Sequence, residues 1–411
     1  MRLYPGPRRR RRARGWLALP LLVVLALIGW AAWLQVSYPT AAPWTSAGYI
    51  LRGLGRKHAR MTAQVVGFMP YWRLDDTPSM RPELLSQVIY FGLTSDGSGH
   101  IVQTANGQQE PGWRWWNSSS VRDQIARVHI AGDKFLLGVS MQDPAQISSL
   151  LASQSAQQAL TAELTRQVAT NKLDGLNVDF EVDGKVSDQD RAGFTAFATT
   201  LVAAMHGAGA SASVDLPALA ARTTNGLYDV PALSRIFDQV VVMSYDYYAM
   251  TSDVAGPVAP MSGFQEGDYF FDVTTTYADF LKVAPKDKLL MGVPYYGYDW
   301  PVQDASQPLA KTLAQNDANG YAELVSYSRA QTDADLTGKN CQWDATADET
   351  RCAYTRAGIQ RQAWLEEERS IGIKFDFAHA QGLGGVALWT LGYDGSYPQL
   401  WNLIGHDFAN G

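Results

Sequence analysis

Residues that build metal centres are scarce in this 411-residue sequence. It has six histidines, which show no metal-ligand spacing, and two cysteines, Cys341 and Cys352. Two thiols without nearby histidines do not make a zinc site. Asp179, Glu181 and Asp246 carry hard oxygen ligands, but their spacing lacks the glycine and the ligand periodicity of a calcium loop. The sequence therefore predicts no metal site.

Several other signatures are also absent. No G-x-G-x-x-G fingerprint follows the first apolar run, which argues against a dinucleotide-binding doubly wound sheet. No repeat occurs at a solenoid period, and no Ser-His-Asp arrangement is better supported than chance. Seven of the 34 basic residues lie before residue 16, so the rest of the chain has 27 basic against 40 acidic residues. Such an acidic body is a poor candidate for binding nucleic acid.

The N-terminal region has the pattern of a membrane anchor. A basic segment at 1–15 precedes an uncharged, mostly apolar run at 16–36, which is about long enough to cross a hydrocarbon core of roughly 30 Å. We expect a cytoplasmic tail, a transmembrane signal-anchor, and then a juxtamembrane linker at 37–63, with the body outside a cell membrane that the chain crosses once. The alternative is a cleaved signal peptide and a secreted protein, although the run exceeds the usual h-region of about 7 to 15 residues.

Both alternatives export the body of the protein into an oxidising compartment. In that compartment the close pair Cys341 and Cys352 is most simply a local disulfide.

From residue 64 onward, short apolar or β-branched runs alternate with helical patterns. The eight runs are 64–69, 87–91, 134–140, 173–181, 212–216, 239–244, 289–294 and 385–389. The helical candidates include 119–129, 154–170, 189–206, 231–237, 274–283 and 361–381. Alternation of this kind predicts parallel strands with right-handed crossovers, and eight units favour an α/β fold, a (β/α)8 TIM barrel over 64–411. A doubly wound open sheet is the second candidate.

The interval between the seventh and eighth runs is too long for one loop and one helix. It spans about ninety residues, which predicts an insertion. Short β-like pieces and turn residues around the cysteine pair indicate a small α+β subdomain at about 301–360. Because it would follow the C-terminal end of a barrel strand, we expect it to form a wall beside the active-site mouth.

The fourth run, L-D-G-L-N-V-D-F-E at 173–181, contains the chemistry. A period of two places its apolar residues on one face and its polar residues on the other. The polar residues are Asn177, Asp179 and Glu181. Two carboxyl groups at i and i+2 that lose water cannot both ionise freely, so one should have a raised pKa, as a general acid at neutral pH requires.

Other strand ends are polar or aromatic in the same way, and they include Tyr71, Asp215, Tyr245, Tyr295 and Trp389. In a barrel these positions converge at one mouth. Aromatic rings beside carboxylates are typical of a sugar site, because sugar faces are apolar while sugar hydroxyls need acceptors.

These motifs resemble glycoside hydrolase family 18, the chitinase-like family. D-G-L-N-V-D-F-E at 174–181 is similar to the family signature D-x-x-D-x-D-x-E. Supporting matches are M-S-Y-D at 243–246, G-V-P-Y-Y-G at 292–297 and G-L-G-G-V-A-L-W-T-L-G at 382–392. The resemblance runs from about residue 64 to the C-terminus. It implies a barrel enzyme that cleaves β-1,4 linkages of N-acetylglucosamine glycans, either chitin-type or peptidoglycan, with no cofactor.

The resemblance also implies roles for individual residues. Glu181 would protonate the leaving oxygen, while the substrate's own acetamido oxygen attacks the anomeric carbon. Asp179 would hold the acetamide N–H, and Tyr245 would hydrogen-bond its carbonyl oxygen. Asp246 would contact the same sugar, and Trp389 would form its apolar floor. Tyr71, Tyr295 and Met243 are further candidates for substrate binding.

Two departures from the family pattern stand out. Asn177 occupies the position of the usual middle aspartate, so Asp179 is expected to lean on an amide, and one like charge is removed from the cluster. This substitution is similar to the subgroup of bacterial spore-cortex and cell-wall N-acetylglucosaminidases, which favours peptidoglycan. The family's S-x-G-G after the third strand is replaced by G-V-S-M-Q at 138–142.

Two alternatives remain at this stage. A family member that has lost its acid becomes a non-catalytic glycan-binding lectin, although the presence of Glu181 favours an enzyme. Trp113, Trp115 and Trp116 either stack a glycan beyond the cleavage point or pack the barrel's upper edge.

Overall fold

The structure is a computed structural model, which describes residues 60–410. Eight parallel strands close into a barrel, in the spatial order β10-β16-β2-β3-β6-β7-β8-β9. Their bounds are β2 Gln64–Pro70, β3 Gln87–Thr94, β6 Lys134–Met141, β7 Gly175–Phe180, β8 Ser211–Pro217, β9 Gln239–Met243, β10 Leu289–Pro294 and β16 Gly385–Trp389. Each lies on one of the eight predicted runs, and the predicted barrel is confirmed.

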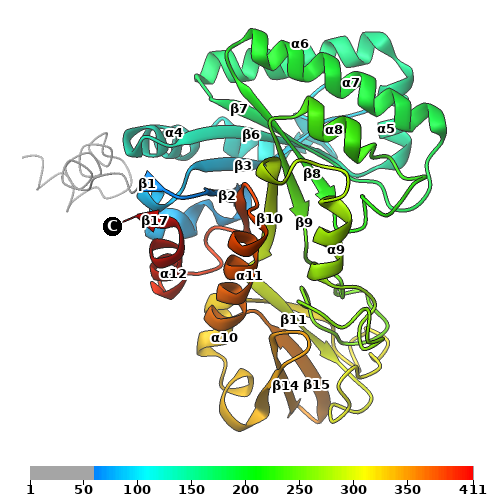
Figure 1. Ribbon diagram of the computed structural model, residues 1–411, viewed down its shortest axis with the longest axis vertical. Coiled ribbons are helices and arrows are strands. Elements are labelled where there is room, and N and C mark those ends of the chain that lie inside the picture. Colours follow the sequence, from blue (N-terminus) through cyan, green and yellow to red (C-terminus); the bar gives the residue numbers. More distant parts are fainter. Residues whose placement is uncertain (1–59, 411) are drawn as a thin grey trace, which may run out of the picture. The chain divides into compact units, whose positions relative to one another are not determined.

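Helices surround the barrel (Figure 1). Their bounds are α3 Pro111–Trp116, α4 Ser119–Ala131, α5 Pro144–Ala152, α6 Gln154–Asn171, α7 Asp188–Gly207, α8 Val230–Ile236, α9 Val273–Phe280, α11 Glu368–Gln381 and α12 Gln399–Phe408. The long helices begin at side-chain caps, as at Ser118, Ser153 and Ser187, each of which accepts a backbone N–H of its first turn.

One predicted helix is wrong in its first part. Residues Ile359–Leu365 form strand β15, and α11 begins only at Glu368. Antiparallel partners on both sides of β15 supply its backbone hydrogen bonds, which overrides a local helical pattern. A capping box between Glu367 and Ser370 then starts the helix.

The barrel strands bury two separate apolar layers. The inner layer fills part of the barrel and consists of Val66, Phe68, Ile89, Leu136, Val241, Leu290 and Ala387. The outer layer lies between strands and helices, and there Phe180 of β7 contacts Phe194 and Phe197 of α7 at ring distances of 6.0 and 6.1 Å. Because side chains alternate along a strand, Asn177 and Asp179 face the barrel interior.

Partly exposed polar contacts join strands and helices at the N-terminal ends of the barrel strands. Asp174, the first aspartate of the signature, accepts a backbone N–H of β6 at 2.8 Å and contacts His129 of α4 at 2.9 Å. Asp238 likewise accepts a backbone N–H of β8 at 2.8 Å and contacts His206 of α7 at 3.0 Å. Asp174 is therefore a structural residue at the opposite end of β7 from Glu181.

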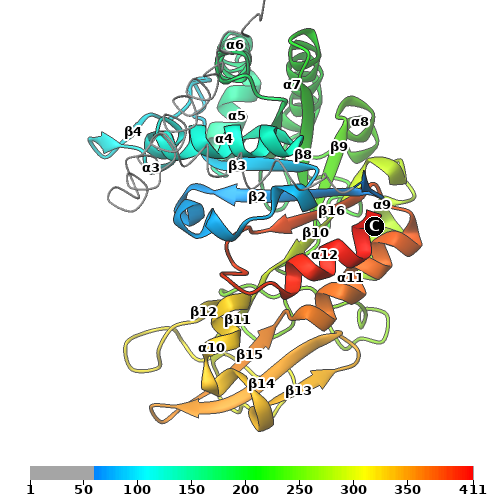
Figure 2. The same ribbon diagram turned by 90° about the vertical axis from the view of Figure 1, so that its left-hand side faces the viewer.

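The insertion between β10 and β16 is a five-stranded antiparallel sheet in the order β12-β11-β15-β14-β13. Figure 2 shows it beside the barrel, together with the short helix α10 Tyr327–Thr332. Its other strands are β11 Tyr296–Pro301, β12 Glu323–Ser326, β13 Cys341–Asp344 and β14 Glu349–Arg356. The insertion extends beyond the predicted range of 301–360 at both ends. Strand β11 already begins at Tyr296, with a single residue between it and the end of β10, and β15 ends at Leu365.

A buried ion cluster joins the insertion to the barrel. Glu349 of β14 accepts the backbone N–H groups of residues 258 and 259, at 3.0 and 2.6 Å. Lys374 of α11 forms an ion pair of 2.7 Å with Glu366, which follows β15. All three side chains are fully buried. Burial and the charge of Glu366 raise the pKa of Glu349, while the charge of Lys374 opposes the rise.

The first and last described residues lie together. Strand β1 Arg60–Met61 pairs antiparallel with β17 Ala409–Asn410, so the end of the predicted linker 37–63 is part of the fold. The predicted transmembrane segment lies outside the described residues. Within 60–410, none of the helices has both the length and the apolar character needed to cross a bilayer.

Cys341 and Cys352 form a disulfide across the β13–β14 hairpin, where they are direct cross-strand partners. The double replacement Cys341→Ser, Cys352→Ser should lower the free energy of unfolding by about 2–3 kcal/mol, because the bond closes a short loop whose entropy the unfolded chain would regain. Thermal unfolding with and without reductant measures the effect. Reductant should leave the double variant unchanged, and a double variant as stable as the wild type would contradict the expectation.

Candidate active site

Strand β7 carries the central polar residues of the site. Asn177 and Asp179 are buried inside the barrel, and Glu181 follows the last residue of the strand. A backbone hydrogen bond of 2.9 Å from the Glu181 N–H to the carbonyl of Met141 continues the pairing of β7 with β6. The acid is thus fixed at the C-terminal mouth of the barrel, where the chemistry of this fold is found.

Glu181 is half-buried and has one direct side-chain partner. Gln142, just after β6, donates a hydrogen bond from Nε2 to Glu181 Oε1 at 2.7 Å. Burial raises the pKa of Glu181; the Gln142 hydrogen bond lowers it, and the charges of Asp183 and Asp246 raise it again. The net pKa is raised, as a proton donor near neutral pH requires.

Asp179 lies deeper than Glu181 and is 3% exposed. Within residues 60–410 its Oδ1 atom is buried and has no hydrogen-bond partner. Burial raises its pKa well above the usual range, and the charges of Glu181 and Asp215 raise it further. A protonated or substrate-paired Asp179 is therefore favoured over a bare carboxylate.

Asn177 does not support Asp179 in the expected way. Its amide Nδ2 donates to Ser213 Oγ at 3.0 Å and to Asp215 Oδ1 at 2.7 Å, both on β8. The two amide hydrogens are thus directed to the neighbouring strand, and Asp179 receives neither. The expectation that Asp179 leans on this amide is wrong, because the partner depends on pairing between strands and not on sequence proximity.

Tyr245 follows β9 and lies among the carboxylates. Burial raises its pKa well above the usual range, and the charges of Asp215, Asp246, Asp179 and Glu181 add to the rise. Its hydroxyl therefore stays protonated and can donate a hydrogen bond. Gly292 makes room for the ring, since a Cβ there would lie 2.9 Å from Tyr245 Cε1.

Asp246 follows Tyr245 and has a left-handed backbone, with φ of 58°. Its Oδ1 accepts hydrogen bonds from the hydroxyls of Tyr296 at 2.6 Å and Tyr298 at 2.9 Å. Burial raises the pKa of Asp246, and the two tyrosine hydroxyls oppose the rise.

Trp389, the last residue of β16, is the centre of an aromatic cluster. Its ring centroid lies 4.8 Å from Phe91, 5.5 Å from Phe68 and 6.5 Å from Trp72. Trp72 is 47% exposed and also contacts Tyr71 at 4.9 Å. The cluster forms an apolar surface at the same barrel mouth as Glu181.

Tyr295 does not join the carboxylates. It is buried, and the charged group that raises its pKa, after burial itself, is Asp394. The next residue, Tyr296, is the one that contacts Asp246. Consecutive residues of an extended chain point to opposite sides, so the period-two rule applied to β7 would have distinguished the two tyrosines. Met243 ends β9 half-buried, two residues before Tyr245.

The three tryptophans between β3 and α4 lie on α3. Trp116 is buried, donates to Gln167 of α6 at 3.0 Å and packs on Tyr90 at 5.1 Å. Trp113 and Trp115 are partly buried against the same core. These contacts favour the packing role over glycan stacking.

The structure adds residues that sequence reasoning gave no role. They are Gln142, Ser213, Asp215, Tyr228, Tyr296 and Tyr298. Asp215 was marked only as a polar residue on a strand. Tyr228 fixes the end of β7, because its hydroxyl donates to the carbonyl of Phe180 at 2.8 Å. Gln142 and Tyr296 lie within the quoted motifs at 138–142 and 292–297, but the contacts of all six residues become visible only in the barrel geometry.

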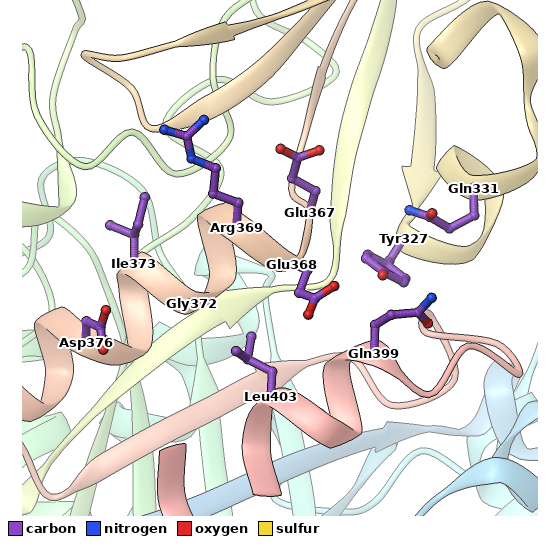
Figure 3. A pocket seen from close by; sticks show the side chains of 10 residues that line it. All are labelled: Tyr327, Gln331, Glu367, Glu368, Arg369, Gly372, Ile373, Asp376, Gln399 and Leu403. Carbon is purple, nitrogen blue, oxygen red and sulfur yellow. The ribbon is translucent and has the colours of Figure 1, made fainter. Parts of the chain in front are cut away.

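A separate pocket of about 640 Å³ lies among α10, α11 and α12 (Figure 3). It is lined by Tyr327, Gln331, Glu367, Glu368, Arg369, Gly372, Ile373, Asp376, Gln399 and Leu403. Glu367 caps α11, and Arg369 lies 3.7 Å from the centre of the Trp343 ring. The carboxylates at the barrel mouth do not line this pocket. The pocket is therefore distinct from the candidate active site, which lies at the barrel mouth.

Residues 64–394 match the family model of the glycosyl hydrolases family 18, and the chain belongs to that family. The family membership that the sequence motifs predicted is thus confirmed. The chain is 28% identical over 266 residues to the cortical fragment-lytic enzyme of Bacillus subtilis (strain 168), an alignment that covers 63% of this chain and 55% of that enzyme. The chain thus spans about half the length of this curated relative.

Solved structures show the same fold. The Group IV chitinase of Ostrinia furnacalis in complex with allosamidin matches with a TM-score of 0.70 and 18% identity, over 84% of this chain and 98% of that one. The spore cortex-lytic enzyme SleL of Bacillus megaterium QM B1551 matches with a TM-score of 0.65 and 20% identity, over 84% and 74%.

The contact between Gln142 and Glu181 gives a testable consequence. Gln142→Ala removes a hydrogen bond that lowers the pKa of Glu181, so that pKa should rise. If protonated Glu181 is the active form, the basic limb of the pH–rate profile should move to higher pH, as rates on a chromogenic N-acetylglucosaminide would show. Gln146→Ala is a matched control, because Gln146 accepts from Gly97 and not from the acid. A basic limb unchanged in Gln142→Ala would contradict this role.

Proposed function

We propose that the chain is a glycoside hydrolase that cleaves β-1,4 linkages of N-acetylglucosamine-containing glycans by substrate-assisted retaining catalysis. The observation that carries the proposal is the pair formed by Glu181 and Asp179. One is a half-buried carboxyl at the mouth with a raised pKa, and the other is a deeper carboxyl two residues before it on the same face of β7.

In the first step, protonated Glu181 gives its proton to the glycosidic oxygen as the bond to the anomeric carbon breaks. The carbonyl oxygen of the substrate's acetamide attacks that carbon and forms a cyclic oxazolinium. The enzyme supplies no nucleophile. In the second step, the Glu181 carboxylate takes a proton from water as the water oxygen attacks the same carbon and breaks its bond to the acetamide oxygen, which restores the acid and the acetamide and retains the configuration.

Asp179 and Tyr245 would hold the acetamide between them. Asp179 accepts its N–H, which directs the carbonyl oxygen toward the anomeric carbon and offsets the positive charge of the oxazolinium. The hydroxyl of Tyr245, kept protonated by its buried and acidic surroundings, donates to the carbonyl oxygen. The free Oδ1 of Asp179 is available for this contact.

Trp389 and Asp246 would position the sugar itself. The exposed part of the Trp389 cluster provides a floor for the apolar face of the ring. Asp246, held by the hydroxyls of Tyr296 and Tyr298, can accept a sugar hydroxyl. Met243 and Tyr71 lie near these groups in the sequence and complete the proposed set.

Peptidoglycan is the preferred substrate class, and chitin-type glycans are the second. Asn177 at the position of the usual aspartate supports the first, and so does the similarity to a cortical fragment-lytic enzyme and a spore cortex-lytic enzyme. The similarity to a chitinase solved with allosamidin supports the second. Both polymers offer the acetamido group that the mechanism needs.

The proposed location is outside the cell membrane, with residues 16–36 as the tether. The apolar run preceded by arginines supports it. Membranes from cells that produce the full chain should retain it through alkaline carbonate extraction. A soluble exported protein whose N-terminal sequence begins after the apolar run would instead establish the cleaved signal peptide.

The test of function compares the wild type with Glu181→Gln on chitin oligomers and on purified peptidoglycan, measuring release of reducing ends. The variant should lose about 10²- to 10⁴-fold in kcat and keep its binding, because a positioned general acid contributes that much. Glu368→Gln, an exposed glutamate of α11, is the matched control. Glycan binding by the wild type without any turnover would contradict the proposal and establish the lectin alternative.

A further inference from the structure

The segment that follows β9 carries two residues of the proposed site, Tyr245 and Asp246, and it is attached to the insertion. The attachment is made by Glu349, the first residue of β14. We propose that Glu349 is a positioning residue for Tyr245 and Asp246, and that it acts on them through the backbone of Val258 and Tyr247. The inference rests on the proposed function, in which Tyr245 holds the acetamide and Asp246 holds a sugar hydroxyl.

The first link joins Glu349 to the segment after β9. Its two carboxylate oxygens accept the backbone N–H groups of Val258 and Ala259, at 3.0 and 2.6 Å. All three residues are fully buried, so the two N–H groups cannot turn to bulk water for an acceptor. The position of Val258 therefore depends on the length and the chemistry of the side chain at position 349.

The second link joins Val258 to the residue after Asp246. The carbonyl of Val258 accepts the backbone N–H of Tyr247 at 3.1 Å, so the chain from 247 to 258 folds back on itself. The side chain of Tyr247 is held separately, by a hydrogen bond of 2.6 Å between its hydroxyl and Thr276 of α9. Movement of Val258 therefore acts on the peptide bond that joins Asp246 to Tyr247.

Asp246 needs support from outside its own segment. Its φ of 58° lies in the left-handed region, which residues other than glycine adopt at a cost. Its side chain is held by the hydroxyls of Tyr296 and Tyr298 on β11. The insertion thus holds Asp246 twice, by the side chain through β11 and by the backbone through Glu349 of β14. The two contacts together define where Asp246 lies in the mouth.

A purely structural role for Glu349 makes a different prediction. Glu349 lies in a buried cluster with Glu366 and Lys374, and the charge of Lys374 acts on both carboxyl groups. If the cluster only stabilised the fold, loss of either carboxylate would leave catalysis by the folded protein unchanged. Glu366, however, contacts Lys374 and Ser370 of α11, whereas Glu349 contacts the segment after β9. Comparison of the two carboxylates therefore separates positioning from stability.

The charge of Asp246 gives the positioning role a signature in the pH profile. This charge raises the pKa of Glu181, so an Asp246 that moves away should raise it less. The basic limb of the pH–rate profile should then move to lower pH, opposite to the shift expected for Gln142→Ala. The acidic and phenolic groups that face Glu181 from its own strand and from neighbouring segments are Asp179, Asp183, Asp215, Tyr228, Tyr245 and Asp246.

The experiment measures kcat, KM and the pH–rate profile of the full chain on an N-acetylglucosamine oligomer, together with thermal unfolding. Glu349→Gln keeps the size of the side chain but replaces one acceptor oxygen by an NH2 group, which cannot accept a backbone N–H. Its kcat should fall by about 10- to 100-fold, because misplacement caused by a remote substitution can cost that much. KM should change less, since Tyr245 acts on charge that develops in the transition state. The basic limb should move to lower pH.

Glu366→Gln is the matched control, because it makes the same chemical change in the same cluster without removing the acceptor of Val258 and Ala259. It should lower the unfolding temperature and keep the kcat and the basic limb of the wild type. Glu349→Asp is a second variant, which keeps the charge of the cluster but is one methylene shorter. It should show a loss of kcat and a basic limb at lower pH, and it carries the test even if Glu349→Gln fails to fold.

Folded Glu349→Gln and Glu349→Asp proteins with the kcat and the basic limb of the wild type would overturn the inference. A folded Glu366→Gln protein with the same loss of kcat as Glu349→Gln would also overturn it, because the cluster would then act through stability alone. Failure of the proposed function is distinguishable from both results, since it would appear as activity retained in Glu181→Gln.

Discussion

Desolvation of like charges inside the barrel is the constraint on which the site depends. Alternation along β7 directs Asn177 and Asp179 into the interior, and β8 adds Asp215 beside them. Burial removes water from the carboxyl groups there and raises the pKa of Asp179 and Asp215 well above the usual range, and neighbouring carboxylates add to the rise. A fold that kept these side chains in water would have no comparable acid at neutral pH.

The surrounding residues meet this constraint with neutral donors. The amide of Asn177 donates a hydrogen bond to Asp215, and the amide of Gln142 donates one to Glu181. The hydroxyls of two tyrosines donate to Asp246. A lysine or arginine at any of these positions would hold its partner ionised and remove the proton needed for catalysis. Hydrogen bonds from neutral groups instead lower the pKa of each carboxyl only in part, so that the pKa of Glu181, Asp215 and Asp246 stays raised.

The sequence predicted the parts of the molecule whose signal is local. Buried parallel strands appear as continuous apolar runs, so all eight were found, and the alternation in 173–181 placed Asp179 inside the barrel and Glu181 at the end of β7. The start of α11 was wrong because β15 obtains its hydrogen bonds from distant partners. Asn177 was linked to Asp179 because the two are close in sequence, whereas its amide reaches across to β8. Gln142 could be assigned only once β6 and β7 were known to be neighbours.

The ion cluster of Glu349, Glu366 and Lys374 bears on how the insertion could have been acquired or lost. A segment that follows a barrel strand can usually be exchanged like a loop, because only its two ends touch the scaffold. Here excision of the sheet would remove Glu349 and leave two buried backbone N–H groups of the barrel without an acceptor. The insertion and the barrel are therefore structurally interdependent, so that removing the sheet calls for compensating changes in the barrel.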